Sequence, residues 1–349
     1  MGLFDTFMRS DPTVVGIDIG SHAIKVVEVS RKGDRATVSN YGVGYLPPDA
    51  IVDGEVMDSE IVVECIQDLL NERGISGKNV ASAISGRSVI VKRIQMDQMS
   101  EEEAADAIYW EAEQHVPYGI DEISLDYQIL GDSEEEGKMD VLLVAAKRET
   151  VEMHTALLRD AGLTPYVVDV DSFAVQNSFE ANYESEEGER VLLLNVGSSV
   201  TNVNLLRNGA PLITRDLSVA GSAFADEVQR TLEVDREEAL KIIQSDSEED
   251  QERISPILET VGQDLLLGIE RSLSYLKGNS GASDVSRAIL SGGGSCLAGL
   301  QSYLSTRLGI PVDIANPLKE IEYDPNLFAD MEVDRIGPSL MVALGLALR

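Results

Sequence analysis

Residues 14–29 read VVGIDIGSHAIKVVEV, and this stretch decides how the chain folds. An apolar, β-branched run is interrupted by one acid, Asp18, and one glycine, Gly20, and then continues with alternating side chains. Two strands separated by so short an interval form a hairpin rather than a helical crossover. The stretch therefore predicts two antiparallel strands joined by a tight turn that lies beside a carboxylate.

The same pattern returns about half a chain later. Residues 192–209 read LLLNVGSSVTNVNLLRNG, where Gly197 aligns with Gly20 and Asn195 aligns with Asp18. Both copies are a strand, a glycine-serine turn and a return strand. Around them, strands alternate with helices, as in mixed α/β proteins. The repeat predicts an α/β protein with two duplicated lobes.

Length and charge limit the function classes. A chain of 349 residues is long enough for more than one core. Its 61 acidic residues against 28 basic ones give a net charge of -33. Nucleic-acid binding depends on basic side chains that displace counterions, so we expect no nucleic-acid partner. The same charge disfavours contact with anionic lipid headgroups, and no apolar run is long enough to cross a membrane.

Local composition gives three smaller predictions. Residues 1–12, MGLFDTFMRSDP, lack a basic targeting region and are expected to form a flexible tail. The two cysteines, Cys65 and Cys296, lie in apolar stretches and are expected to be small core residues in a reducing compartment. Three acidic runs are typical of solvated loops. They are SEEE (133–136), ESEEGE (184–189) and SEEDQE (247–252).

Three glycine-rich turns could bind phosphate, because glycine lets backbone N–H groups approach one oxygen-rich group. They are Gly20-Ser21-His22, Gly197-Ser198-Ser199 and Gly292-Gly293-Gly294. Any one of them could be an ordinary turn, but two matched turns and a third cluster are more specific. Asp18 could hold a hydrated magnesium ion. Lys25 could neutralise phosphate charge or could be a solvated lysine on a strand.

This combination resembles the actin, Hsp70 and sugar-kinase superfamily, whose two phosphate hairpins clamp ATP from opposite lobes. The resemblance implies ATP and Mg²⁺ as ligands, and it makes LSGGGSCLAGL (290–300) the adenosine motif. The implied nucleotide-binding residues are Gly20, Ser21, His22, Lys25, Gly197, Ser198, Ser199, Thr201, Gly221, Glu238, Lys241, Gly292, Gly293 and Gly294. The implied metal ligands are Asp18 and, through a water molecule, Asn195. Glu238 could equally belong to a helix cap with Asp235.

One position departs from the superfamily pattern. The second hairpin commonly has an acid where this chain has Asn195. An amide can order a metal-bound water but adds no negative charge. Loss of such a supporting carboxylate costs about 10- to 100-fold in metal affinity or activity. We therefore expect weak magnesium dependence or, at most, slow hydrolysis, and no catalytic base can be singled out from the sequence.

Within the superfamily the chain resembles the PilM family of type IV pilus assembly proteins, which are related to FtsA. The most distinctive stretch is YWEAEQHVPYGIDEISLDYQIL (109–130), and the likeness extends over nearly the whole chain from residue 13. It implies an inserted subdomain, called 1C, whose groove against the first lobe receives the N-terminal cytoplasmic peptide of the inner-membrane protein PilN. Tyr109 and Trp110 would lie in this subdomain, either near that groove or in its core.

The resemblance also implies a location and a division into parts. The protein would be cytoplasmic and peripheral to the inner membrane through PilN, with other inner-membrane assembly proteins and self-association as further contacts. The predicted parts are a tail (1–12), lobe 1 or 1A (13–86 and 166–184), subdomain 1C (87–165), lobe 2 or 2A (185–221 and 284–349) and subdomain 2B (222–283).

Two other functions fit the same fold. A sugar or small-molecule kinase would need an acid placed to deprotonate a hydroxyl nucleophile. An FtsA-like cell-division protein usually ends in an amphipathic membrane helix, whereas LMVALGLALR (340–349) is apolar throughout and suits burial.

Overall fold

The structure is a computed structural model that describes residues 13–33, 35–52, 54–245, 247–274, 285–328 and 333–349. The tail predicted for residues 1–12 lies outside the described residues. Among the residues described, no helix is both long and apolar enough to cross a membrane.

The first hairpin forms the centre of a six-stranded sheet with the order β10-β6-β1-β2-β3-β16. β1 and β2 are antiparallel, in a register that runs from Thr13 opposite Ser30 to Ile19 opposite Ile24. This pairing confirms the hairpin predicted from residues 14–29. The strands are β1 (Thr13–Ile19), β2 (Ala23–Lys32), β3 (Arg35–Tyr45), β6 (Asn79–Ile84), β10 (Thr164–Val170) and β16 (Glu322–Tyr323).

The second hairpin is the centre of a five-stranded sheet with the order β13-β12-β11-β14-β15. Its strands are β11 (Arg190–Val196), β12 (Thr201–Arg207), β13 (Ala210–Leu217), β14 (Arg287–Ser291) and β15 (Val312–Ile314). In both sheets three antiparallel strands are followed by two parallel ones, since β6 and β10 correspond to β14 and β15. The matching order of strands supports the duplication inferred from the sequence.

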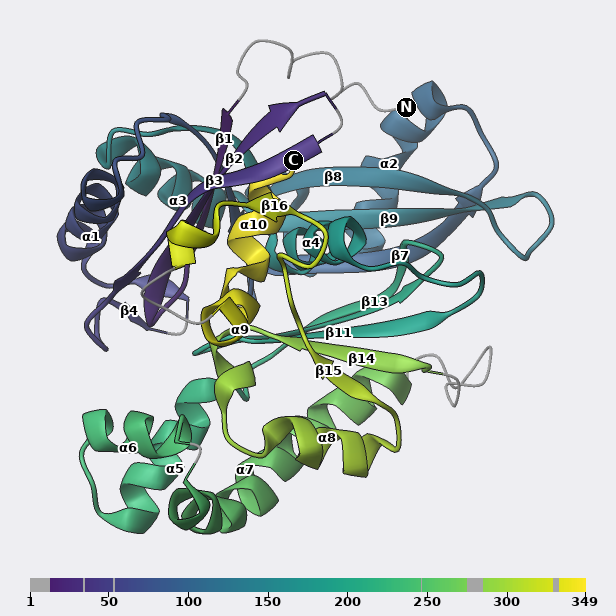
Figure 1. The fold of residues 1–349 in the computed structure, drawn as a ribbon. Helices are drawn as coiled ribbons and strands as arrows, with labels where there is room; N and C mark the ends of the chain where they lie inside the picture. Colours follow the sequence, from purple (N-terminus) through teal and green to yellow (C-terminus); the bar gives the residue numbers. More distant parts are fainter. Residues whose placement is uncertain (1–12, 34, 53, 246, 275–284, 329–332) are drawn as a thin grey trace.

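Two helices lie between the two sheets, α4 (Asp171–Asn182) and α10 (Met341–Ala347). One core cluster joins residues of α4 and α10 to residues of β6 and β11. The two helices approach so closely that a Cβ atom at Gly345 would lie 1.7 Å from the Ala174 carbonyl oxygen. A Cβ atom at Gly16 on β1 would lie 2.0 Å from the Ala343 oxygen. Glycine at these positions brings the lobes together (Figure 1).

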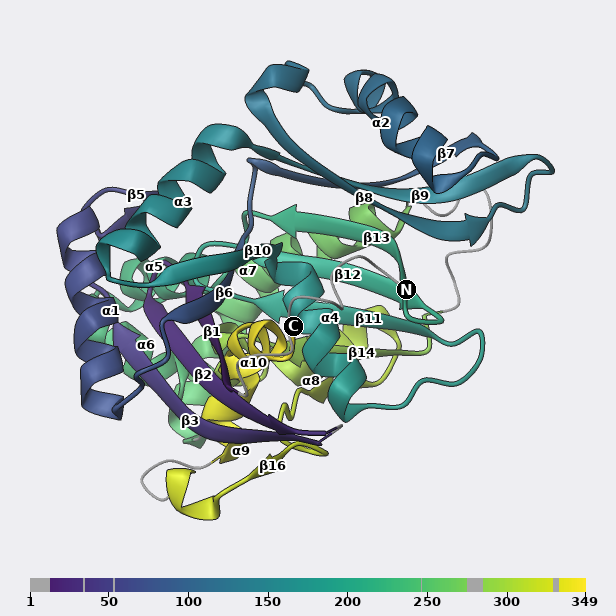
Figure 2. The same cartoon turned by 90° about the horizontal axis from the view of Figure 1, so that it is seen from above.

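A smaller unit is inserted after β6. It consists of β7 (Val89–Asp97), β8 (Ile123–Asp132), β9 (Lys138–Lys147) and α2 (Glu101–His115), with the sheet order β7-β9-β8. Ser100 and Glu103 form a capping box at the start of α2, and the face of α2 that includes Ile108 is buried on the sheet. Figure 2 shows α2 on the outer side of this sheet and β13 of the second lobe on the other side.

The remaining helices cover the outer faces of the two lobes (Figure 1). They are α1 (Ser59–Arg73) and α3 (Arg148–Asp160) on the first lobe, and α5 (Gly221–Leu232), α6 (Arg236–Ile243), α7 (Glu248–Ser274) and α8 (Leu300–Leu308) on the second. α3 follows the inserted unit in sequence, but its Leu157 and Leu158 pack in the core of the first lobe.

Two of the local predictions are corrected by the structure. The run SEEDQE (247–252) is not a loop, because α7 already begins at Glu248. The Ser247 hydroxyl accepts a hydrogen bond from the Asp250 N–H at 3.2 Å, which stabilises this first turn as an N-cap does. Cys65 and Cys296 are both only half-buried and are therefore not core residues.

Candidate functional site

The first glycine turn is closed by its own backbone. The Gly20 N–H donates to the Ala23 carbonyl at 3.2 Å, and a Cβ atom at Gly20 would lie 3.1 Å from that oxygen and 3.2 Å from the Lys25 Nζ. A side chain would therefore push Lys25 away from the turn. Asp18 and Lys25 face each other in the β1–β2 register and form an ion pair of 2.9 Å, with only 12% and 17% of their side chains exposed.

The second turn has the same geometry. The Gly197 N–H donates to the Val200 carbonyl at 2.9 Å, and a Cβ atom at Gly197 would lie 2.8 Å from that oxygen. The turn is also hydrogen-bonded to the start of α5. The Gly221 N–H donates to the Gly197 carbonyl, and the Ser222 N–H donates to the Ser198 carbonyl. Gly221 thus positions the turn through its backbone.

The structure brings the two turns together. The Ser21 and Ser199 hydroxyl oxygens are 2.6 Å apart, although 178 residues separate them in the sequence. Within the described part of the chain, none of the hydrogen bonds that close the turns uses the N–H groups of Ser21, His22, Ser198 or Ser199. These four donors belong to the two turns whose hydroxyl groups meet, and backbone N–H groups in glycine turns are suited to an anion site.

The third glycine cluster has mainly a packing role. A Cβ atom at Gly292 would lie 2.3 Å from the Val196 oxygen, and one at Gly294 would lie 2.4 Å from the Val196 Cγ1. Gly292 has φ of 84°, which disfavours any other residue there. Only Gly293 has open space around its Cα. The cluster therefore fits tightly beside the second turn, and Gly293 is its one open position.

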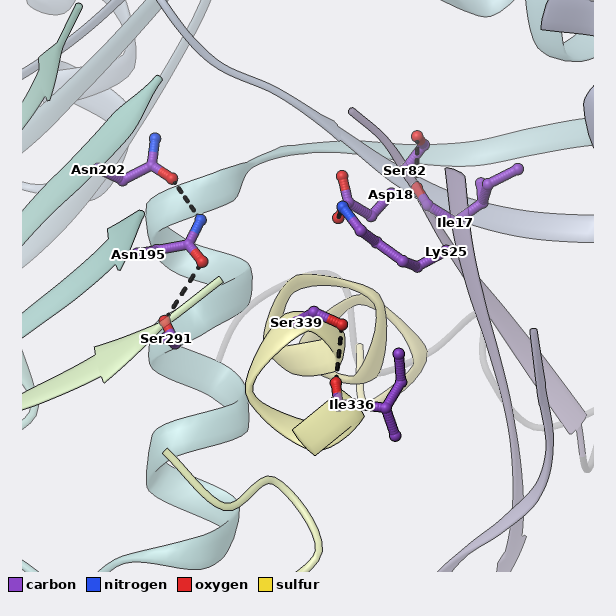
Figure 3. A network of polar contacts seen from close by, with 9 residues as sticks. All are labelled: Ile17, Asp18, Lys25, Ser82, Asn195, Asn202, Ser291, Ile336 and Ser339. Atoms are coloured by element: carbon purple, nitrogen blue, oxygen red, sulfur yellow. Dashed lines mark hydrogen bonds and ion pairs between the residues drawn. The ribbon is translucent and has the colours of Figure 1, made fainter. Parts of the chain in front are cut away.

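Asn195 belongs to a chain of polar contacts behind the second turn. Its Oδ1 accepts from the Ser291 hydroxyl at 3.2 Å, and its Nδ2 donates to the Asn202 Oδ1 at 2.8 Å. Asn202 in turn donates to the Asp216 Oδ1 at 2.8 Å. Figure 3 shows this group on one side of the short helix that includes Ser339 and the pair Asp18 and Lys25 on the other. Asn195 is thus fixed opposite Asp18.

Asp216 connects the second lobe to the inserted unit. Its Oδ2 accepts from the Gly86 N–H at 2.6 Å, and Gly86 lies in the segment that leads from β6 into β7. Burial raises the pKa of Asp216, while the hydrogen bonds from Asn202 and Gly86 lower it. Contacts from Ser291 to Gly86 therefore form one continuous path across the two lobes.

Asp171, at the start of α4, is a further acid of the site that the sequence did not single out. Burial, followed by the nearby charge of Asp18, raises the pKa of Asp171 to about 7, while a hydrogen bond from Ser85 opposes the shift. Two carboxylates that repel each other favour a cation or a shared proton between them. Asp171 therefore releases its proton at a much higher pH than an ordinary aspartate does.

Two histidines adjoin the first hairpin. The Ser82 hydroxyl donates to the Ile17 carbonyl at 2.8 Å and lies 2.8 Å from the His154 Nε2. Since the one hydroxyl proton is used, His154 is the donor in that second contact. Burial lowers the pKa of His154 to about 4, so its ring is neutral and holds the end of β1 in place. Burial and the charge of Arg236 lower the pKa of His22.

Three of the predicted residues make contacts of their own in the structure. Thr201 is fully buried, and its hydroxyl donates to the Val219 carbonyl at 2.7 Å. The Glu238 N–H donates to the Asp235 carboxylate as a helix cap at 2.9 Å, and Lys241 pairs with Glu237 on an exposed surface at 2.8 Å. On this helix it is Arg236 whose charge reaches His22, and no local pattern indicated this residue.

Comparison with known proteins supports the fold. A solved PilM-PilN type IV pilus biogenesis complex has a TM-score of 0.86 and 32% identity, over 96% of this chain and 98% of that one. Ethanolamine utilization protein EutJ from Carboxydothermus hydrogenoformans has a TM-score of 0.59 and 16% identity, over 97% and 90% of the two chains. MreB5 of Spiroplasma citri bound to ADP has a TM-score of 0.53 and 11% identity, over 95% and 94%. The last two show the fold alone.

Two sequence comparisons complete the assignment to a family. Cell division protein FtsA of Pseudomonas aeruginosa is 23% identical over 255 residues, which are 64% of this chain and 58% of that protein. The match thus spans less than two thirds of that relative. A family model described as type IV pilus assembly protein PilM matches residues 16–349. The predicted actin-like ATPase fold is confirmed, and the chain belongs to the PilM family of type IV pilus assembly proteins.

Proposed function

We propose that this protein is an ATP-binding scaffold of type IV pilus assembly that binds the N-terminal cytoplasmic peptide of PilN. The observation that supports nucleotide binding best is the 2.6 Å approach of Ser21 and Ser199 from two duplicated turns. Support for the peptide comes from the likeness, over 96% of this chain, to a protein solved as a PilM-PilN complex. Family membership favours this function over a sugar kinase or a cell-division protein.

The residues present fit ATP with Mg²⁺. The N–H groups of Ser21, His22, Ser198 and Ser199 would bind phosphate oxygens, and their two hydroxyl groups would part to admit them. Lys25 would offset phosphate charge. Asp18 would bind the ion through water, with Asn195 ordering a second water. Bound Mg²⁺ would supply positive charge between the phosphates and the carboxylates.

The acidic residues of the site would support at most slow hydrolysis of ATP. Asp171 is the residue we assign to proton transfer from an attacking water, because a pKa of about 7 lets it take up or release a proton near neutrality. Its neighbour Asp18 is paired with Lys25 at 2.9 Å. Asn195 adds no charge of its own, as expected for a weakly active site.

A path of polar contacts would couple the nucleotide to the inserted unit. It runs from Ser291 through Asn195, Asn202 and Asp216 to Gly86. Lobe closure moves the second hairpin, and Asp216 transmits that movement to the segment that enters β7. Such coupling requires that ATP bind the open and closed arrangements unequally.

For the PilN peptide we propose the junction between the first sheet and the inserted sheet. Tyr166 on β10 is 40% exposed there, and burial of the rest of its ring raises its pKa to about 12, while the charges of Arg31 and Arg349 lower it. Arg349 bonds the buried Asp169 at 2.6 Å, and the charge of Asp126 on β8 reaches that carboxylate. An extended peptide finds an aromatic ring and cationic groups at this junction.

The test is a titration of the chain with a synthetic N-terminal PilN peptide, with and without Mg²⁺-ATP, by calorimetry. We expect saturable binding, and an affinity that ATP changes by about 5-fold or more, as expected for a coupled site. A scrambled peptide is the control. Equal binding of both peptides would contradict the partner, and an affinity indifferent to ATP would contradict the coupling.

Lys25→Ala is expected to weaken Mg²⁺-ATP binding about 10-fold, because it leaves Asp18 and Asp171 without their nearby cation. Lys32→Ala is the matched control, since Lys32 is exposed at the far end of the same strand. Calorimetry measures both variants. Unchanged ATP affinity in Lys25→Ala, with the fold intact by circular dichroism, would remove Lys25 from the site.

A further inference from the structure

α2 forms the outer surface of the inserted unit, on the side away from β13 (Figure 2). On α2, Trp110 is 73% exposed and Tyr109 is 54% exposed, so the reading of these residues as core is wrong. Trp110 is the only tryptophan of the chain. Burying so large a side chain would be worth about 1.5–3 kcal/mol, so its exposure on a rigid helix marks a surface for contact.

Beside Trp110 the surface is hollowed. The shallow pocket is lined by Met99, Glu103, Asp106, Ala107 and Trp110. Met99 and Ala107 are partly buried against the core of the inserted unit, and Met99 gives the pocket a flexible apolar side chain. The pocket is therefore suited to an apolar side chain next to Trp110.

The rim of the pocket is acidic, and hydrogen bonds fix the position of one of its carboxylates. The Glu103 carboxylate accepts from both the Ser100 N–H and its hydroxyl at 2.9 Å, and these bonds lower the pKa of Glu103. Asp106 lies one turn along the same helix. The remaining acids of α2 are Glu101, Glu102, Glu111 and Glu113. An occupant must combine an apolar anchor with positive charge.

We propose that this face of α2 is a docking site for a basic amphipathic segment of a partner protein, which inserts an apolar side chain beside Trp110 and pairs its lysines or arginines with Glu103 and Asp106. Charge complementarity decides between occupants. A second copy of this chain, with a net charge of -33, would be repelled from the acidic rim, and so would an anionic membrane. Figure 2 shows α2 on the side of the inserted sheet away from β13, so the partner would not obstruct the nucleotide turns.

Trp110 itself reports the interaction. A tryptophan-free helical peptide of leucine and lysine at amphipathic spacing is added to the full chain, and indole emission is recorded. We expect a saturable blue shift as Trp110 becomes buried, and none with a leucine–glutamate peptide of the same pattern or with a scrambled leucine–lysine peptide.

Variants then test the site by calorimetry. Trp110→Ala is expected to weaken binding of the leucine–lysine peptide about 30-fold, as for an interface anchor. The double variant Glu103→Gln with Asp106→Asn is expected to weaken binding of the same peptide about 5-fold, since each surface charge pair contributes modestly. Glutamine at 103 can still complete the capping box, so α2 stays folded. The matched control, Glu64→Gln with Asp68→Asn, neutralises two exposed acids one turn apart on α1.

The outcomes separate the explanations. Loss of affinity in the α2 variants with no change in the α1 control supports the proposal. Equal loss in both pairs means non-specific attraction and overturns it, as does binding without a shift in Trp110 emission. A shift caused by higher protein concentration, by anionic vesicles or by a peptide of residues 1–12, but not by the basic peptide, would assign the surface to another occupant. PilN-peptide binding, measured in the same samples, is independent of all these results.

Discussion

Gly345→Ala is expected to lower the free energy of unfolding by about 3 kcal/mol. The added methyl group would lie 1.7 Å from the Ala174 carbonyl oxygen, and a Cβ atom has no rotamer that could avoid this contact. Overpacking of this kind costs about 1–3 kcal/mol or more, and separating α4 from α10 also disturbs the core cluster between the sheets. The loss is expected despite the roughly 1 kcal/mol by which alanine is the better helix former.

Urea denaturation of the wild type and Gly345→Ala measures this effect. The matched control is Gly119→Ala, where a Cβ atom would be 3.6 Å from Glu122 and φ is -62°, so the change should stay within about 0.5 kcal/mol. If both variants unfolded at the same urea concentration, the close crossing of the two central helices would not be a source of stability.

Asp171→Asn is expected to stabilise the ligand-free protein at pH 8 by about 2–4 kcal/mol. Burial and the charge of Asp18 raise the pKa of Asp171 from its ordinary value of 3.8 to about 7 in the folded chain, so the folded state binds more protons than the unfolded state between these limits. Stability of the wild type therefore falls as the pH rises from about 4 to about 7 and then levels off. Asparagine keeps an acceptor for Ser85 and has no proton to lose.

Denaturation at several pH values between 4 and 8 tests this prediction. The difference between Asp171→Asn and the wild type should be small near pH 4 and grow up to pH 7. Asp313→Asn, which neutralises an exposed acid on β15, should follow the wild-type curve. A constant difference across the range would show that Asp171 is ionised in the folded state, and the pKa raised by burial and by the charge of Asp18 would then be refuted.

The sequence predicts those parts of the fold that are determined by local residue patterns. The two hairpins followed from the alternation around Gly20 and Gly197, because each hairpin depends on residues close in sequence. The matching strand order of the two sheets then follows from the repeat.

The site residues that the sequence did not predict depend on contacts between elements that are far apart in the chain. Asp171 becomes part of the site only because α4 begins beside the first hairpin, and Asp216 only because β13 runs past Gly86. Helix spacing could not show whether Trp110 faced a core or the solvent, since that depends on how α2 lies on its sheet. Side chains whose environment comes from three-dimensional packing have no local signature.

The hydrogen bond between Gly86 and Asp216 has a consequence for dissecting the molecule. Excising the inserted unit would remove the segment that holds this glycine and would leave a buried carboxylate in the second lobe without one of its two donors. The shortened protein would then differ in the remote lobe as well as at the cut. A truncation that abolished partner recognition could therefore not be attributed to the missing surface alone.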